Sequence, residues 1–128
     1  MPAQDFILRQ AKDFARVLAY LLGLAKKGEL SEALEFVEQT LVKNYGLKDQ
    51  FSKEKLEEAI KEGRIRPEEL IFVGDLLRFK GDTLASLGED ANAWYVNALT
   101  AIELGMEKTG TFSFEVQQKI ETLRSLKR

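Results

Sequence analysis

Cysteine and histidine are both absent from the 128-residue sequence. Without cysteine the chain forms no disulfide and has no thiolate that could serve as a nucleophile or metal ligand. Without histidine it lacks the commonest general base and the commonest ligand of transition metals. We therefore expect no catalytic residues, no metal site and no cofactor, and we predict that the protein is not an enzyme.

An excess of positive charge is also missing. The 19 basic residues are balanced by 21 acidic residues, which gives a net charge of −2 and a pI near 5.3. No global positive field is therefore available to attract a nucleic acid. The basic C-terminal segment LRSLKR is better explained as the usual complement of a helix dipole. Nucleic acid is accordingly disfavoured as a partner.

Long apolar runs are missing too, since none approaches the roughly 20 residues that span a bilayer. Residues 16–28 are apolar and follow basic residues, as in a signal peptide. However, Asp5 and Asp13 interrupt the basic flank, which is atypical of such a signal. We expect a cytoplasmic protein of bacterial type with no membrane partner.

Apolar residues recur at helical spacing along the chain, and no segment shows the alternation of a β-strand. The sequence predicts a single all-α domain over residues 1–128. Two antiparallel helical hairpins, over about 5–46 and 67–105, are joined by a connector over 47–66 and followed by a docking helix over about 113–126. Helices are predicted near residues 5–27, 31–45, 53–62, 67–87, 90–104 and 113–126. The fourth has a candidate break near residues 80–82, and Gly105 and Gly110 are predicted to bracket a loop.

The first predicted helix carries apolar residues over a wide arc. Its polar residues recur every three or four positions and form a narrow stripe, so the apolar side chains face more directions than one neighbouring helix covers. Either the rest of the chain or a second molecule must cover this surface. We favour a homodimer, because twofold pairing through one shared patch is common. The candidate dimer contacts are Phe6, Leu8 and Phe14.

The two predicted hairpins resemble each other when the chain is shifted by 60 residues, from Gly28 to Gly88. The shift also aligns Leu24 with Leu84, Ala25 with Ala85, Glu29 with Glu89, Ala33 with Ala93 and Thr40 with Thr100. This spacing of small and apolar residues resembles the tetratricopeptide repeat. The resemblance implies that Ala33 and Ala93 lie buried at close helix crossings. A generic helical bundle with two similar hairpins is the alternative. The chain is also similar to small bacterial helical proteins of unknown function.

The tetratricopeptide resemblance also implies a binding groove on the first helix of each hairpin. The candidate groove residues are Leu18, Leu22 and Lys26 from one hairpin, and Asp75, Arg78 and Asp82 from the other. Leu22 and Asp82 stand where the family's clamp for peptide C-termini uses asparagine, so that activity is not supported. The alternative is a solvated charged face with ordinary pairs between successive helical turns.

The remaining chemistry-bearing residues favour structural roles. Neighbouring acidic residues such as Glu68 and Glu69 point about 100° apart on a helix, so a pair does not converge on one metal ion. Trp94 and Tyr95 are more typical of core packing than of a ligand cage.

Taken with the composition, these features predict a non-enzymatic protein-interaction module or small scaffold. The alternatives are a small-molecule binder or enzyme that uses carboxylates and arginine, and a nucleic-acid-associated regulator.

Overall fold

The all-α prediction is confirmed. The computed structural model describes the backbone of residues 2–48 and 51–128 and the side chains of residues 13–48 and 51–128. Within these ranges it contains helices and no strand. The elements are α1 (Pro2–Lys26), α2 (Leu30–Tyr45), α3 (Lys53–Lys61), the short 3₁₀ helix η1 (Pro67–Glu69), α4 (Leu70–Ser86), α5 (Asn92–Thr109) and α6 (Phe114–Leu126).

The chain divides into two compact units, residues 1–33 and residues 34–128. Unit 1 contains α1 and the first turn of α2. Gly28 ends α1 in a left-handed conformation with φ +79°, and the N–H of Glu29 donates to the carbonyl of Leu24 at 2.9 Å. Because α2 continues from one unit into the other, the packing of the first predicted hairpin stays a prediction.

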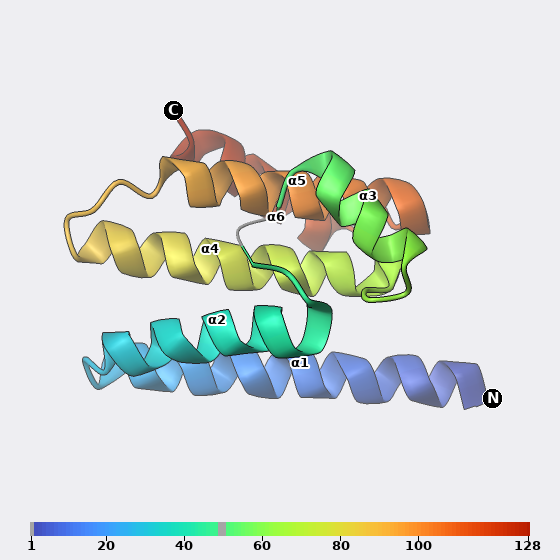
Figure 1. Ribbon diagram of the computed structural model, residues 1–128, viewed down its shortest axis with the longest axis horizontal. Coiled ribbons are helices and arrows are strands. Elements are labelled where there is room, and N and C mark those ends of the chain that lie inside the picture. Colours follow the sequence, from blue (N-terminus) through green and yellow to red (C-terminus); the bar gives the residue numbers. More distant parts are fainter. Residues whose placement is uncertain (1, 49–50) are drawn as a thin grey trace. The chain divides into compact units, whose positions relative to one another are not determined.

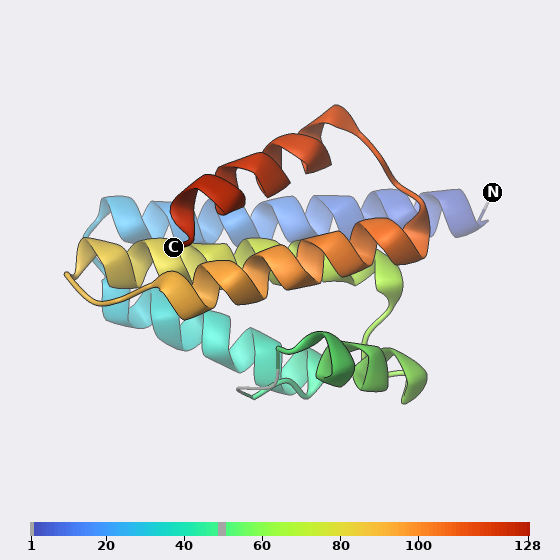
Figure 2. The ribbon, with the colours of Figure 1, turned by 90° about the horizontal axis from the view of Figure 1, so that it is seen from above.

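Unit 2 is built around the antiparallel pair α4 and α5, which lie side by side in Figures 1 and 2. Helix α6 packs against α5, and α3 also contacts α5. Val116, Ile120 and Leu123, which are spaced four and three residues apart, form the buried stripe of α6. Helix α3 begins as its sequence indicates, with the Ser52 hydroxyl accepting the N–H of Lys55 at 3.3 Å.

The α4–α5 pair is unusually close because glycines stand at its contacts. A Cβ atom on Gly74 would meet the side chain of Ile102 and, at 3.1 Å, the carbonyl oxygen of Ala98. A Cβ on Gly81 would lie 2.8 Å from Cε1 of Tyr95. All five of these residues are buried in the core of unit 2. The two helices therefore lie too close together for a larger side chain at either glycine.

Two predictions about these glycines are wrong. Helix α4 runs through Gly81 without a break, and Gly105 lies inside α5, which ends only at Thr109. The physical reason is tertiary: a Cβ on Gly105 would come within 2.9 Å of the Leu70 Cβ. Close packing therefore offsets the weak helix propensity of glycine at these positions.

The equivalence of Ala33 and Ala93 is also only half right. Ala33 is fully buried, as expected, whereas Ala93 is exposed. Helix α2 begins at Leu30, two residues after Gly28, whereas α5 begins at Asn92, four residues after Gly88. Ala93 consequently lies in the first turn of its helix, and Ala98 and Ala101 are the buried alanines of α5.

The first testable prediction compares two helical glycines. Gly74→Ala should destabilise the protein by about 1–3 kcal/mol, because the added methyl overpacks the α4–α5 contact. The matched control is Gly23→Ala in α1, where an added Cβ meets nothing within 4 Å. That change should stabilise the protein by up to about 1 kcal/mol, the helix-propensity difference between glycine and alanine. Urea unfolding measures both, and equal effects of the two substitutions would contradict the close crossing.

Candidate functional site

A cavity of about 130 Å³ opens in unit 2 where α2, α4 and α5 approach the α2–α3 loop. We call it the Trp94 pocket. Helix α2 contributes Glu38, Leu41 and Val42, the loop contributes Leu47, Lys48 and Phe51, α4 contributes Lys80, and α5 contributes Trp94. The lining therefore combines an apolar floor with two ammonium groups and one carboxylate.

The floor of the pocket is aromatic and aliphatic. Leu41, Leu47 and Phe51 are buried, and Trp94 is half-buried. The rings of Phe51 and Trp94 lie 5.8 Å apart between centroids and are inclined by 59°, an arrangement that aromatic pairs favour. Val42 is 44% exposed at the rim. The pocket therefore presents a firm apolar surface to an entering group.

Lys80 carries its charge directly over this floor. Its Nζ atom lies 3.8 Å from the Trp94 ring centroid and 2.8 Å from Oε1 of Glu38. The Lys80 side chain is 12% exposed and that of Glu38 is 60% exposed. The ammonium is attracted by the face of the indole ring and donates a hydrogen bond to the carboxylate. These two contacts fix the Lys80 ammonium at the edge of a cavity whose floor is apolar.

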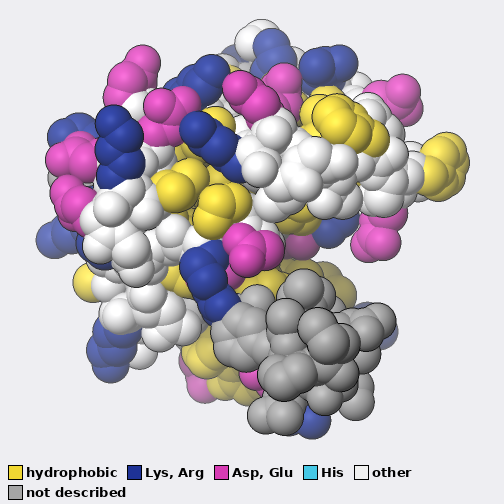
Figure 3. All heavy atoms as spheres, turned by 90° about the vertical axis from the view of Figure 1, so that its right-hand side faces the viewer, with side chains coloured by type: hydrophobic (Ala, Val, Ile, Leu, Met, Phe, Trp, Pro, Cys, Tyr) yellow, Lys and Arg dark blue, Asp and Glu magenta, His cyan; other side chains and the backbone are white. Residues whose placement is uncertain are grey.

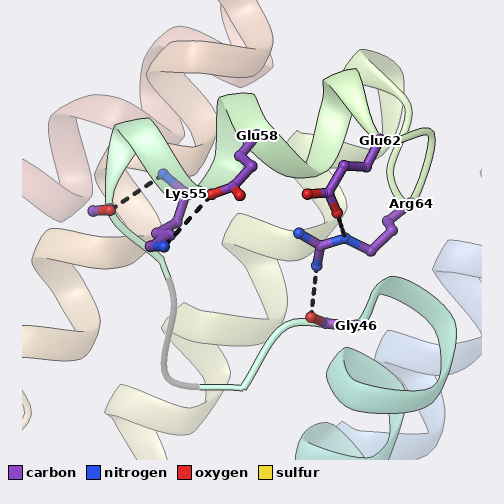
Figure 4. A network of polar contacts seen from close by, with 6 residues as sticks. Gly46, Lys55, Glu58, Glu62 and Arg64 are labelled. Carbon is purple, nitrogen blue, oxygen red and sulfur yellow. Dashed lines mark hydrogen bonds and ion pairs between the residues drawn. The ribbon is translucent and has the colours of Figure 1, made fainter.

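The α2–α3 loop is fastened by Arg64, which follows α3 (Figure 4). Its guanidinium donates to the carbonyl of Gly46 at 2.7 Å, and its Nε donates to Oε2 of Glu62 at 2.8 Å. Gly46 ends α2 in a left-handed conformation, with φ +62°. The loop residues Leu47 and Phe51 are thereby held between two anchored helix ends. Arg64 thus supports the pocket without lining it.

The predicted groove residues of α1 lie in unit 1. Leu18 is half-buried, Leu22 is 59% exposed, and Lys26 is exposed. Leu22 and Lys26 share a shallow depression on the surface of α1 with Ala19, Gly23 and Ala25. The second set of residues lies in unit 2, so a groove shared by the two sets stays a prediction.

The second set lies on α4, where contacts within unit 2 engage all three residues. Oδ2 of Asp75 lies 2.7 Å from the Nζ of Lys119 in α6. Arg78 and Asp82 form an ion pair at 3.5 Å one turn apart. Burial raises the pKa of the Asp75 carboxyl, and the Lys119 hydrogen bond opposes that change. Asp75 therefore helps to hold α6 against α4, whereas the Arg78–Asp82 pair joins two successive turns of α4 itself.

Of the predicted dimer contacts, Phe14 has a described side chain. The side chains of Phe6 and Leu8 lie outside the described residues, and Phe14 is half-buried. The α1-mediated homodimer therefore stays a prediction.

Sequence reasoning missed the Trp94 pocket. Tyr95 is a core residue, as expected, but Trp94 lines a cavity and holds a cation. No local spacing signals this arrangement, because Glu38, Lys80 and Trp94 come from three helices. The exposed pair Phe112 and Phe114 was also missed. Phe114 lies outside the apolar stripe of α6. This position is the sequence signal from which its exposure could have been predicted.

Comparison of the chain with protein-family models, curated proteins and solved structures found no match in any of the three. The tetratricopeptide resemblance therefore rests on the residues alone. Among the described residues, no helix is both long and apolar enough to cross a bilayer. Those residues also contain no cluster of three or more acidic side chains placed to hold a metal ion.

The second testable prediction concerns Asp82 and Tyr95. The Tyr95 hydroxyl donates to Oδ1 of Asp82 at 2.8 Å, and burial, together with this carboxylate, raises the pKa of Tyr95 to about 12. A raised pKa means that the stabilising contribution is complete below the ordinary tyrosine pKa of about 10. This contribution to stability is lost as the pH rises from about 10 towards about 12, the pKa of Tyr95 in the folded protein.

Tyr95→Phe should therefore lower the free energy of unfolding by about 0.5–1.5 kcal/mol at pH 7. The difference from the parent chain should shrink between about pH 10 and pH 12. Asp82→Asn is the control, because it keeps an oxygen acceptor and removes the charge. In this variant, absorbance titration of tyrosinate should show a lower pKa for Tyr95. An unchanged pKa would contradict the conclusion that the Asp82 carboxylate raises it.

Proposed function

We propose that the protein is a non-enzymatic protein-interaction module that binds an acidic segment of a polypeptide at the Trp94 pocket. The main support is the Lys80 ammonium, held 3.8 Å from the Trp94 ring centroid at the edge of a cavity with an apolar floor. An apolar side chain fits the floor, while a neighbouring carboxylate approaches Lys80. The expected cytoplasmic location belongs to the same proposal.

The size of the cavity supports a single side chain as the anchor. An apolar cavity of about 150 Å³ accepts a benzene ring, and the Trp94 pocket measures about 130 Å³. One phenylalanine or leucine side chain therefore matches it. Burial of such a side chain contributes about 1.5–3 kcal/mol, which suits a modest and reversible interaction.

The charges of the lining support an acidic segment. Lys80 and the exposed Lys48 outnumber the single carboxylate of Glu38 in the lining. An ammonium group has three donors, and Glu38 accepts from one of them. A ligand carboxylate can use another without displacing Lys80 from the indole ring. A basic segment would instead meet like charge at the rim.

The third testable prediction uses Trp94 as its own reporter, because it is the sole tryptophan of the chain. Short blocked peptides with one phenylalanine between two glutamates should change its fluorescence on titration. Peptides with lysine in place of glutamate, or alanine in place of phenylalanine, should bind at least about tenfold more weakly, since tenfold corresponds to about 1.4 kcal/mol. Added salt should weaken binding of the acidic peptide, because it screens the attraction between the peptide carboxylates and the lysines.

Protein variants test the same contact from the other side. Lys80→Met keeps an apolar chain over Trp94 but removes the charge, so affinity for the acidic peptide should fall about tenfold, the effect of about 1.4 kcal/mol. Lys108→Met, an equal change at an exposed position of α5, is the matched control and should bind normally. Equal binding of acidic and basic peptides would refute the proposal. Binding of free phenylacetate with no gain from the peptide would favour a small-molecule site.

A further inference from the structure

Two aromatic side chains are displayed at the far end of unit 2. Phe112 is 66% exposed and Phe114 is 77% exposed, the two highest values among the large hydrophobic residues of the described chain. They stand at the end of the α5–α6 loop and the start of α6. We call this pair the Phe knob. Figure 3 shows the side of unit 2 on which this loop lies. Hydrophobic side chains reach the surface in this view, among acidic and basic ones.

Hydrogen bonds hold the backbone around the knob. The Ser113 hydroxyl, between the two aromatic residues, accepts the N–H of Val116 at 3.2 Å. On the other side, the Thr109 hydroxyl donates to the carbonyl of Gly105 at 2.8 Å and accepts the N–H of Thr111 at 3.3 Å. The aromatic pair is therefore presented in a defined position, which reduces the ordering cost of binding.

The knob cannot reach the pocket of its own chain. Trp94 lies in the first turn of α5, and the knob follows the last residue of that helix, Thr109. The 15 residues between Trp94 and Thr109 rise by about 22 Å at 1.5 Å per residue. Figures 1 and 2 show the two ends of α5 well apart, with the α5–α6 loop at the far end. Only a second molecule can bring a knob to a pocket.

The knob and the pocket match in size and in charge. One phenylalanine ring fits a cavity of about 130 Å³, given that about 150 Å³ accepts benzene. The residue after Phe114 is the exposed Glu115, and the pocket rim carries the exposed Lys48. Glu115 points about 100° away from Phe114 around α6, so its carboxylate can meet a cation on the rim, outside the cavity that Phe114 fills.

We propose that the Trp94 pocket binds the Phe knob of a second copy of this chain. Phe114 enters the cavity, Phe112 packs on its rim, and Glu115 approaches Lys48. The contact joins two different surfaces, so it is heterologous, and repetition builds rings or open chains of molecules. This inference rests on the proposed function, because it names the polypeptide that the pocket receives.

Sedimentation equilibrium over a wide range of protein concentration tests the inference. The parent chain should show an average mass that rises with concentration beyond that of a dimer. The knob variant Phe112→Ser/Phe114→Ser and the pocket variant Val42→Glu should each lose this rise beyond a dimer, because each lacks one half of the contact. Circular dichroism and thermal unfolding should show that both variants, altered at exposed positions, remain folded.

Mixing the two variants gives the sharper test. The knob variant retains a pocket and the pocket variant retains a knob, so the mixture should form a one-to-one heterodimer and no larger species. The heterodimer should change the Trp94 fluorescence of the knob variant. A charge exchange extends the test: Lys48→Glu and Glu115→Lys should each weaken association, and the double variant should recover part of it.

A control variant distinguishes association through the Phe knob from association through other exposed apolar residues. Leu87→Ser removes an exposed leucine from the α4–α5 turn and should leave association unchanged. A monomeric parent chain, or association that survives loss of the knob, would overturn the inference. If acidic peptides still bind at Trp94 in that case, the proposed function stands without it. If neither peptides nor a second copy bind, both fail.

Discussion

The close approach of α4 and α5 is the contact on which the rest of unit 2 depends. At Gly81 the two helices are so near that a Cβ atom would lie 2.8 Å from Tyr95 and 3.3 Å from the Cβ of Trp94. Lys80 precedes Gly81 in sequence, so the same approach brings its ammonium over the indole ring. A larger residue at position 81 would push α5 away and separate the cation from its aromatic partner. The pocket is therefore a consequence of backbone proximity.

That proximity has a cost in helix stability which packing must offset. Gly74 and Gly81 each disfavour α4 by about 1 kcal/mol relative to alanine, and Gly105 does the same in α5. In return, Ile102 and Leu70 pack directly against the backbone of the opposite helix. Protein interiors are packed as densely as organic crystals, and a gap between these helices would forfeit the dispersion contacts of both. The glycines are therefore best regarded as packing residues.

Local signals in the sequence predicted the fold well where local chemistry determines it. Ser52 marks the start of α3, Gly28 the end of α1, and the spacing of Val116 and Ile120 the buried face of α6. Each of these depends on residues a few positions apart, through capping hydrogen bonds or helical periodicity. Helix type and number therefore follow from the sequence with little information about tertiary structure.

The errors occur where a tertiary contact overrides a local preference. Gly105 was interpreted as a helix end because glycine often stands there, yet in the fold it allows Leu70 to approach. Ala93 was matched to Ala33 by counting residues from the turn, but the second turn is longer and α5 starts later. Sequence reasoning missed the Trp94 pocket for the same reason, because its charged and aromatic groups come together only through helix packing. A single sequence contains no direct record of such distances.

The two partners of Lys80 differ in how firmly they hold it. Glu38 is largely exposed, and an exposed ion pair contributes only about 0–1 kcal/mol, reduced further by salt. The cation–π contact with Trp94 is partly shielded, and such contacts are worth more as water is excluded. An incoming carboxylate can therefore share or replace Glu38 at small cost while the indole ring keeps the ammonium in place. The pocket thus combines a charge fixed by an aromatic ring with a counter-ion that is easily exchanged, the combination that the proposed recognition of an acidic segment would require.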